Sequence, residues 1–237
     1  GVVGIAIGIV LLPNLAKKLA NNDNAGGQNS FNRSLEFSLI IALPSAIALI
    51  VMSNVIISAL FERGVFSSLD TLKTAAALTI YGIGLPAFIG QKIYQPIFYA
   101  RENTRSPFYF ALIAMAVNLT LAVSLAQTFG YLASALGTTI ASWTMLLLLK
   151  NSSKNYGPAT QIDSRNKRVI PKVVIASLIM GGLLLITNHL LSTTFFDVRN
   201  KYVVLLIMMF VGGFSYILIG QLIEAFSFKE IKSYFKK

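Results

Sequence analysis

One lysine stands inside a long apolar stretch, beside two glutamines. The stretch runs from Ala75 to Ala100 and contains Gln91, Lys92 and Gln95. A cation in the hydrocarbon of a membrane is costly, so such a residue marks a functional site by default. Two interpretations stay open: Lys92 faces a polar cavity and binds an anion, or its stem carries the ammonium toward the membrane surface. The glutamines favour the cavity, because a snorkelling lysine does not require them.

The other residues that could do chemistry form no catalytic or metal-binding pattern. The chain has a single His, His189, and no Cys, and its 9 Asp and Glu are scattered along the sequence. Hydrolytic and metal-dependent sites need clustered His, Asp or Glu. The sequence therefore predicts no enzyme, no metal site and no cofactor. His189 lies near the end of an apolar stretch, where an imidazole is expected to act as an interfacial anchor.

Composition predicts the elements that position these residues. The 237-residue chain is 55% hydrophobic and 12% charged, and its mean hydropathy of +0.68 is typical of an integral membrane protein. A spanning helix needs about 20 apolar residues, whereas barrel strands alternate apolar and polar residues. We expect an all-α, polytopic helical bundle with six complete spans. These are Leu35–Phe61, Ala75–Ala100, Phe108–Thr128, Tyr131–Leu149, Val173–Leu191 and Tyr202–Phe226.

A seventh apolar stretch, Gly1–Leu15, is too short to span a membrane. It has no initiator Met, no basic flank and no small-residue cleavage site, so it does not resemble a signal peptide. We expect it to be the remainder of a truncated span, and the part of the protein that precedes it to be missing.

Lys and Arg are distributed unevenly between alternate loops. Fifteen of the 20 fall in residues 17–33, 101–105, 150–172 and 229–237, and four fall in residues 63–73, 127–130 and 197–201. The positive-inside rule places the richer set, and with it the C-terminus, in the cytoplasm. Basic runs can also bind nucleic acid, but these flank the spans. Topology therefore explains the net charge of +11, and no nucleic-acid partner is expected.

Polar segments are expected to connect the helices. Residues 21–30 are rich in Asn and Gly, which predicts a cytoplasmic loop, and residues 151–168 read as a longer linker between two groups of helices. The lysine-rich tail from Lys229 either forms a short amphipathic helix on an anionic membrane surface or frays.

Glycine, proline and small polar residues mark the interiors of the spans. Five Gly and Pro residues from Gly82 to Pro96 are expected to interrupt or kink the helix that carries Lys92. Small residues recur every four positions from Gly130 to Ser142, which favours close helix packing over contact with a solute. Asn118 and Thr138 either coordinate a cation or make hydrogen bonds between helices.

Four strings resemble the MurJ/MviN family of lipid II flippases. They are Leu-Leu-Pro-Asn-Leu-Ala-Lys-Lys-Leu-Ala-Asn-Asn-Asp at 11–23, Ala-Leu-Pro-Ser-Ala at 42–46, Leu-Phe-Glu-Arg-Gly-Val-Phe at 60–66, and Lys-x-x-x-Pro-x-Phe-Tyr-Ala-Arg-x-x-Thr-Arg-Ser-Pro at 92–107. Their order and spacing agree with the family up to about Leu149. The later helices are similar in hydropathy and position only.

The resemblance implies a transporter of the multidrug/oligosaccharidyl-lipid/polysaccharide exporter superfamily, with two lobes around a cationic cavity. Residues 1–150 would form the second lobe, 151–168 a cytoplasmic linker, and 169–237 two additional C-terminal helices and an amphipathic tail. The family moves lipid II, the undecaprenyl-diphosphate-linked peptidoglycan precursor, from the inner to the outer leaflet of the bacterial plasma membrane by alternating access. The implied partners are lipid II, membrane lipids and the missing first lobe.

The same resemblance suggests roles for residues in the cavity. Lys92 falls on a basic position of the family motif, and we expect it to bind the diphosphate together with Gln91 and Gln95. Two other functions stay open. One is export of another polyprenyl-linked saccharide or of drugs, and the other is a membrane scaffold that transports nothing.

Three charged residues lie on family motifs outside the spans. Arg101 is expected to stabilise a cytoplasmic gate, against Glu102 or Glu36. Glu62 and Arg63, in the Phe-Glu-Arg-Gly string, are expected to serve the periplasmic gate. A solvated loop charge or a helix cap remains the alternative for each, since exposed pairs contribute only about 0–1 kcal/mol.

Overall fold

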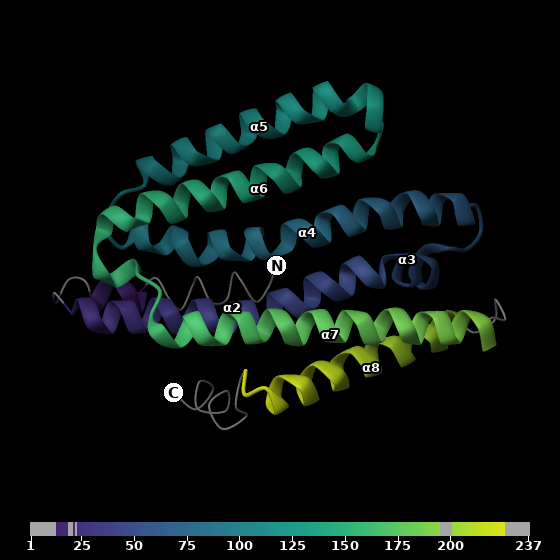
Figure 1. The fold of residues 1–237 in the computed structure, drawn as a ribbon. Helices are drawn as coiled ribbons and strands as arrows, with labels where there is room; N and C mark the ends of the chain where they lie inside the picture. The colour runs from purple at the N-terminus through teal and green to yellow at the C-terminus, as the bar shows by residue number, and fades with distance from the viewer. Residues whose placement is uncertain (1–12, 19–20, 22, 195–200, 226–237) are drawn as a thin grey trace. The chain divides into compact units, whose positions relative to one another are not determined.

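The computed structural model describes residues 13–18, 21, 23–194 and 201–225, and in these residues the secondary structure is helical, with no strand (Figure 1). The predicted all-α fold class is confirmed, and six of the described helices are long and apolar enough to cross a membrane. The predicted stretch Gly1–Leu15 lies mostly outside the described residues. The elements are α2 (Asn24–Val51), α3 (Ser53–Phe61), α4 (Ser68–Tyr99), α5 (Arg105–Phe129), α6 (Leu132–Ser153), η1 (Lys154–Tyr156), η2 (Pro158–Thr160), α7 (Ser164–Thr194) and α8 (Lys201–Leu222).

The helix α2 begins earlier than the sequence predicts. Most of the predicted loop at 21–30 is helical, so that prediction is wrong. Asp23 explains the early start, because its Oδ1 accepts a hydrogen bond of 2.8 Å from the backbone N–H of Gly26 and caps the helix. The predicted span Leu35–Phe61 is divided between α2 and α3, which are separated by the single residue Met52.

The contacts of the chain form two compact units. Unit 1 consists of residues 1–42 and 83–167, and unit 2 of residues 43–82 and 168–237. Helices α2, α4 and α7 each contribute residues to both units. These units are clusters of contacts, and they do not coincide with the predicted lobe, linker and helical pair, whose division of the sequence stays a prediction.

Unit 1 has a core of large apolar and aromatic side chains from α2, α4 and α6. Its buried members include Phe31, Leu35, Ile93, Tyr94, Ile97, Phe98 and Leu149. Within α4 the buried pairs recur after four residues, which places them on one face of the helix. The ring of Phe98 meets that of Tyr156 edge-on at 5.2 Å between centroids. This packing anchors the chain that follows α6.

Helix α4 is one continuous helix that includes Pro86 and Pro96, so the chain is not interrupted there, and a kink at these residues stays a prediction. Its glycines have a packing role. A Cβ at Gly84 would lie 3.0 Å from Oγ1 of Thr139, and one at Gly90 would lie 2.9 Å from Cδ1 of Leu146. Glycine at these two positions lets α6 approach the backbone of α4 closely.

Small residues of α6 also serve packing, but the buried ones lie beside the predicted series at every fourth position, of which Ser134 is exposed. Helices α5 and α6 lie side by side (Figure 1), and Ala133, Gly137 and Ala141 are buried on α6. In unit 2, Gly212 of α8 packs against Leu184 of α7, where an added Cβ would lie 3.3 Å from Cδ2 of the leucine. Helix approach through small residues therefore recurs in both units.

The predicted linker is short and structured, because buried asparagines hold it against α2. Asn32 donates through Nδ2 to the carbonyl of Gln161 at 2.8 Å, and its Oδ1 accepts from the backbone N–H of Asp163 at 2.9 Å. Asn166 donates through Nδ2 to the same Oδ1 and to the backbone carbonyl of Asn32, both at 2.9 Å. Both asparagines are fully buried, so these bonds satisfy groups that are costly to leave unpaired.

Ion pairs reinforce this anchor. Arg33 on α2 pairs with Glu36 and with Asp163, and Arg165 on α7 donates to Oε1 of Glu36 at 2.9 Å. The carboxylate of Glu36 is buried and is shared by two guanidinium groups. Such an arrangement is strongly destabilised when one partner is removed, because the remaining charge is left buried.

Candidate functional site

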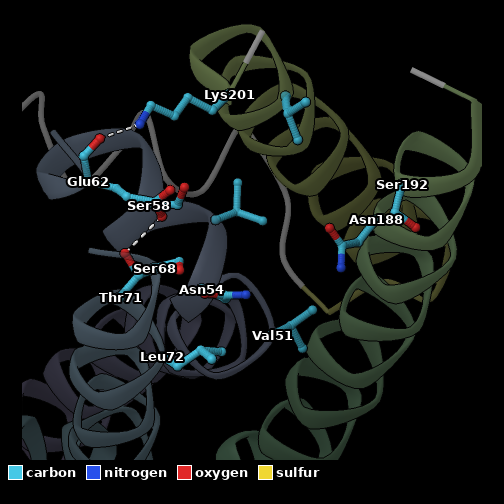
Figure 2. A pocket seen from close by; sticks show the side chains of 12 residues that line it. Val51, Asn54, Ser58, Glu62, Ser68, Thr71, Leu72, Asn188, Ser192 and Lys201 are labelled. Atoms are coloured by element: carbon cyan, nitrogen blue, oxygen red, sulfur yellow. Dashed lines mark hydrogen bonds between the residues drawn. The ribbon is translucent and has the colours of Figure 1, made fainter. Parts of the chain in front are cut away.

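Unit 2 contains a cavity of about 430 Å³ (Figure 2). Side chains from α2, α3, α4, α7 and α8, and from Glu62 directly after α3, line it, and most of these residues are polar. They are Val51, Asn54, Val55, Ser58, Glu62, Ser68, Thr71, Leu72, Asn188, Ser192, Lys201 and Val204. The cavity therefore combines two amides, four hydroxyls, one carboxylate and one ammonium, with apolar side chains between them.

Glu62, one of the predicted gate residues, lies at this cavity and is held from both sides. The Thr71 hydroxyl donates to Oε2 of Glu62 at 2.8 Å, and Nζ of Lys201 donates to the backbone carbonyl of Glu62. Figure 2 shows Lys201 reaching toward Glu62 from α8. The residue therefore ties the end of α3 to the start of α4 and to α8.

Hydrogen bonds from the hydroxyls of Thr71 and, to a lesser degree, Ser58 hold the pKa of Glu62 below its ordinary value. The carboxylate is thus ionised at neutral pH, with its charge already engaged. Its neighbour Arg63 is exposed and does not line the cavity. The structure therefore brings only one of the two predicted gate residues of this loop to a cavity.

Lys92 lies on the α4 face that the rest of unit 1 leaves open. Leu85, Phe88, Lys92, Gln95 and Tyr99 are all exposed or half-buried, and they recur at intervals of three and four residues. This spacing forms a stripe along one face of a helix. The ammonium of Lys92 lies 5.3 Å from the centroid of the Phe88 ring, within the range of a cation–π contact.

Gln91 has a different environment from Lys92 and Gln95. It is buried, and its Nε2 donates to the backbone carbonyl of Ser142 on α6 at 2.8 Å. This hydrogen bond joins α4 to α6. The structure thus separates Gln91 from the other two predicted substrate-binding residues.

Arg101, at the end of α4, contacts the start of the linker. Its guanidinium donates to the backbone carbonyl of Tyr156 at 2.9 Å and lies 4.6 Å from the centroid of the Tyr156 ring. Burial lowers the pKa of Arg101 from its ordinary value, although the guanidinium stays charged. The expected partner Glu36 instead pairs with Arg33 and Arg165.

Asn118 and Thr138 lie at the contact of α5 with α6. A Cβ at Gly137 would lie 2.6 Å from Oδ1 of Asn118, which shows how closely the amide approaches α6. The hydroxyl of Thr138 donates to the carbonyl of Ser134 at 2.9 Å. Among the residues that the structure describes, no cluster of three or more His, Cys, Asp or Glu is placed to hold a metal ion.

Comparison with known proteins decides the family. A family model described as lipid II flippase MurJ matches residues 1–208. The chain belongs to the MurJ family. The match extends into α8, so the resemblance that the motifs carry as far as Leu149 continues through most of the later helices. Together with the six helices of spanning length, it makes the chain a multi-pass protein of the bacterial inner membrane.

Curated relatives and a solved structure agree with this family. The probable lipid II flippase MurJ of Rhizobium meliloti (strain 1021) is 43% identical over 187 residues, which is 78% of this chain and 34% of the relative. That of Rhizobium tropici is 39% identical over 189 residues, 80% of this chain and 35% of the relative. The chain therefore spans about a third of the length of these relatives.

The solved structure is a lipid II flippase MurJ in an inward closed conformation. It superimposes with a TM-score of 0.75 at 27% sequence identity, and covers 92% of this chain and 42% of the solved chain. A likeness of this extent within the MurJ family supports the helix assignment across both units.

Some residues of the unit 2 cavity were not predicted from sequence. Thr71 and Lys201 are ordinary polar residues near the starts of α4 and α8, where sequence gives them no special meaning, and Asn188 lies inside α7. Asn188 carried the clearest signal, since an amide in an apolar stretch usually has a hydrogen-bonding role. That these side chains line one cavity follows from helix packing in this MurJ-family chain.

Proposed function

We propose that the chain forms the second lobe and the two additional C-terminal helices of a lipid II flippase. The flippase moves the undecaprenyl-diphosphate-linked peptidoglycan precursor from the inner to the outer leaflet by alternating access. The observation that carries the proposal is the family match over residues 1–208, with relatives named as probable lipid II flippases. The substrate crosses the membrane without a change in its covalent structure, so no catalytic residue is required.

We further propose that the stripe with Lys92 and Gln95 lines the substrate cavity. A helix face that is open within its own unit and carries one cation, one amide and aromatic rings is suited to an amphiphile with an anionic headgroup. An ammonium binds diphosphate oxygens as a point charge, and the amide adds a neutral donor. Gln91 is left out of this role, because it is buried and bonded to α6.

The partners in this proposal are lipid II, membrane lipids and a first lobe supplied by the remainder of a full-length protein. The first lobe would complete the cavity that the Lys92 stripe faces. Residues 151–168 would connect the second lobe to the additional helices, and hydrogen bonds from Asn32 hold this linker against α2.

The gate residues take supporting roles. Arg101 would hold the end of α4 against the linker through Tyr156. Glu62 would hold the loop between α3 and α4 through Thr71, whereas the exposed Arg63 would contact solvent or headgroups. Asn118 and Thr138 remain candidates for a coupling cation, at a contact that hydrogen bonding between helices explains as well.

Complementation tests this function. The full-length protein should restore growth to a bacterium depleted of its lipid II flippase, and it should restore access of a membrane-impermeant reagent to lipid II at the outer face. Lys92→Gln should lower that access at least tenfold, because the charge that meets the diphosphate is lost. Lys92→Arg should keep most of it.

Two controls make the result specific. Lys73→Gln removes an exposed lysine at the start of the same helix and should leave flipping unchanged. Gln91→Leu should lower the stability of the purified protein more than it lowers flipping per folded molecule. Normal flipping by Lys92→Gln would refute the role of the stripe, and full complementation failure with export of another polyprenyl-linked saccharide would refute lipid II as the substrate.

A further inference from the structure

A second cavity lies in unit 1, where α6 passes into the linker. It encloses about 450 Å³. Three lysines surround it together with uncharged residues, and no carboxylate lines it. The lining residues are Tyr94, Lys150, Ser153, Lys154, Thr160, Gln161, Ile162 and Lys167. We call this the lysine cavity.

The positive charge of the lysine cavity is not balanced within the part of the chain that the structure describes. The two carboxylates of the neighbouring linker and α2, Asp163 and Glu36, are paired with Arg33 and Arg165. Lys150, Lys154 and Lys167 make no ion pair with a described residue. The Nζ of Lys154 donates to Oδ1 of Asn151 at 3.1 Å, which uses one of its three N–H groups.

The floor of the lysine cavity is preorganised, whereas its lysines are exposed. The hydroxyl of Thr160 donates to the carbonyl of Ser153 at 2.9 Å, and the hydroxyl of Ser153 donates to the carbonyl of Lys150 at 2.8 Å. Tyr94 is 4% exposed and meets the ring of Phe31 edge-on at 5.2 Å. The exposed ammonium groups can therefore gather around a ligand above a floor that does not need to rearrange.

The position of the lysine cavity indicates the kind of anion. It lies where one spanning segment, Leu132–Tyr156, ends and the next, Pro158–Ser192, begins. The join between two spans lies at the level of the lipid headgroups. Lysines at that level attract anionic lipids, and an ammonium is a well-suited partner for phosphate oxygens.

We propose that the lysine cavity binds an anionic phosphate group, and that in the membrane the group belongs to the headgroup of an anionic phospholipid. The proposal rests on the cavity, its charge and its place in the fold, and it does not depend on the substrate of the transporter. Tyr94 lies on a different face of α4 from the stripe of Lys92, since Tyr94 is buried in the core of unit 1.

The test measures binding to the purified full-length protein in micelles of a non-ionic, phosphate-free detergent. Native mass spectrometry counts bound lipid during titration with phosphatidylglycerol, with phosphatidylcholine of the same chain length as the uncharged comparison. A parallel titration uses inorganic phosphate. The protein should bind phosphatidylglycerol at least tenfold more tightly than phosphatidylcholine or inorganic phosphate.

Matched variants localise that binding. The triple variant Lys150→Gln, Lys154→Gln and Lys167→Gln should weaken phosphatidylglycerol binding about 100-fold, since each lysine near an anionic headgroup contributes about fivefold. The triple Lys→Arg variant should keep it. The control removes the same charge from exposed positions elsewhere and should change binding less than threefold. It carries Lys17→Gln, Lys73→Gln and Arg168→Gln.

Each outcome decides between the alternatives. Equal losses in the lysine-cavity triple and in the control triple would mean diffuse electrostatics and would overturn the proposal. Binding of inorganic phosphate as tight as that of the lipid, lost in the same triple, would keep the phosphate site and overturn the lipid as its source. No loss in the triple would overturn both. Thermal unfolding of each variant shows whether the variant is folded. The single variant Lys167→Gln should bind phosphatidylglycerol about fivefold more weakly while it stays folded, which separates lost binding from lost folding.

Discussion

The cavity around Glu62 and the lysine cavity have similar volumes, but the first has balanced charges and the second is positively charged. The cavity around Glu62, of about 430 Å³, holds one carboxylate and one ammonium, and both are already engaged in hydrogen bonds. The lysine cavity, of about 450 Å³, holds three ammonium groups and no carboxylate. The role of a lysine therefore depends on its neighbours. Lys201 donates a hydrogen bond within the protein, whereas Lys150, Lys154 and Lys167 have no carboxylate in their cavity and can attract an external anion.

The largest expected difference between the two cavities is the side of the membrane on which the nearby loop lies. The positive-inside rule predicts that loop 62–67 lies outside and the linker 154–163 in the cytoplasm. The chain contains no Cys, so single substitutions can be labelled cleanly. Val65→Cys should react with an impermeant maleimide on intact spheroplasts, and Asn155→Cys only after permeabilisation. Labelling of Asn155→Cys in intact spheroplasts would reverse the assigned orientation.

The anchor beneath the lysine cavity should be the most sensitive to mutation. Asn32→Ala removes the shorter of the two hydrogen bonds to the carbonyl of Gln161 and leaves the N–H of Asp163 without its acceptor, which should lower the free energy of unfolding by about 2–4 kcal/mol. Phosphatidylglycerol binding should fall as well. Thermal unfolding in detergent measures the first effect and native mass spectrometry the second.

Gln28→Ala provides the matched control for the anchor, because Gln28 is only half-buried and donates to the same carbonyl of Gln161 at 3.2 Å. It should cost less than about 1 kcal/mol. If Asn32→Ala and Gln28→Ala are equally mild, the linker is held by the ion pairs and not by the buried amide.

The cavity around Glu62 should respond to the loss of a single hydrogen bond. Thr71 is buried and donates to Glu62, so Thr71→Val should lower the free energy of unfolding by about 1 kcal/mol. Phosphatidylglycerol binding should not change. Thr74→Val, at an exposed position on the same helix, should be nearly neutral, and an equal effect of the two substitutions would mean that the bond to Glu62 contributes nothing.

The smallest expected effect is a dependence on acid pH. Because the pKa of Glu62 is lower in the folded protein, its ionised form contributes stability above the pKa of the unfolded chain, and that contribution is lost as pH falls through the folded pKa. The stability difference between the wild type and Glu62→Gln should therefore shrink between about pH 5 and pH 3. The wild type and the lysine-cavity triple should keep a constant difference in this range, since lysines do not titrate there.

Composition, hydropathy and local motifs were enough to predict the membrane class, most of the spans and the resemblance to the MurJ family. Hydropathy is a property of each segment alone, so a run of apolar residues reports a spanning helix wherever it lies. The motifs at 60–66 and 92–107 carried the family for the same reason, since they are local strings. The early start of α2 was missed, because an Asn- and Gly-rich segment has the composition of a loop and only the cap by Asp23 favours a helix.

Which polar residues act together depends on how the helices pack. Gln91 and Lys92 are adjacent in sequence, yet one is bonded to α6 and the other lies on an open face. Asn32 meets residues about 130 positions away, and Tyr94 joins lysines from the linker at one cavity. Sequence could only count those lysines as signals of topology. Charge balance depends on which carboxylates lie within reach, and distance in space is a property of the packed helices that composition does not contain.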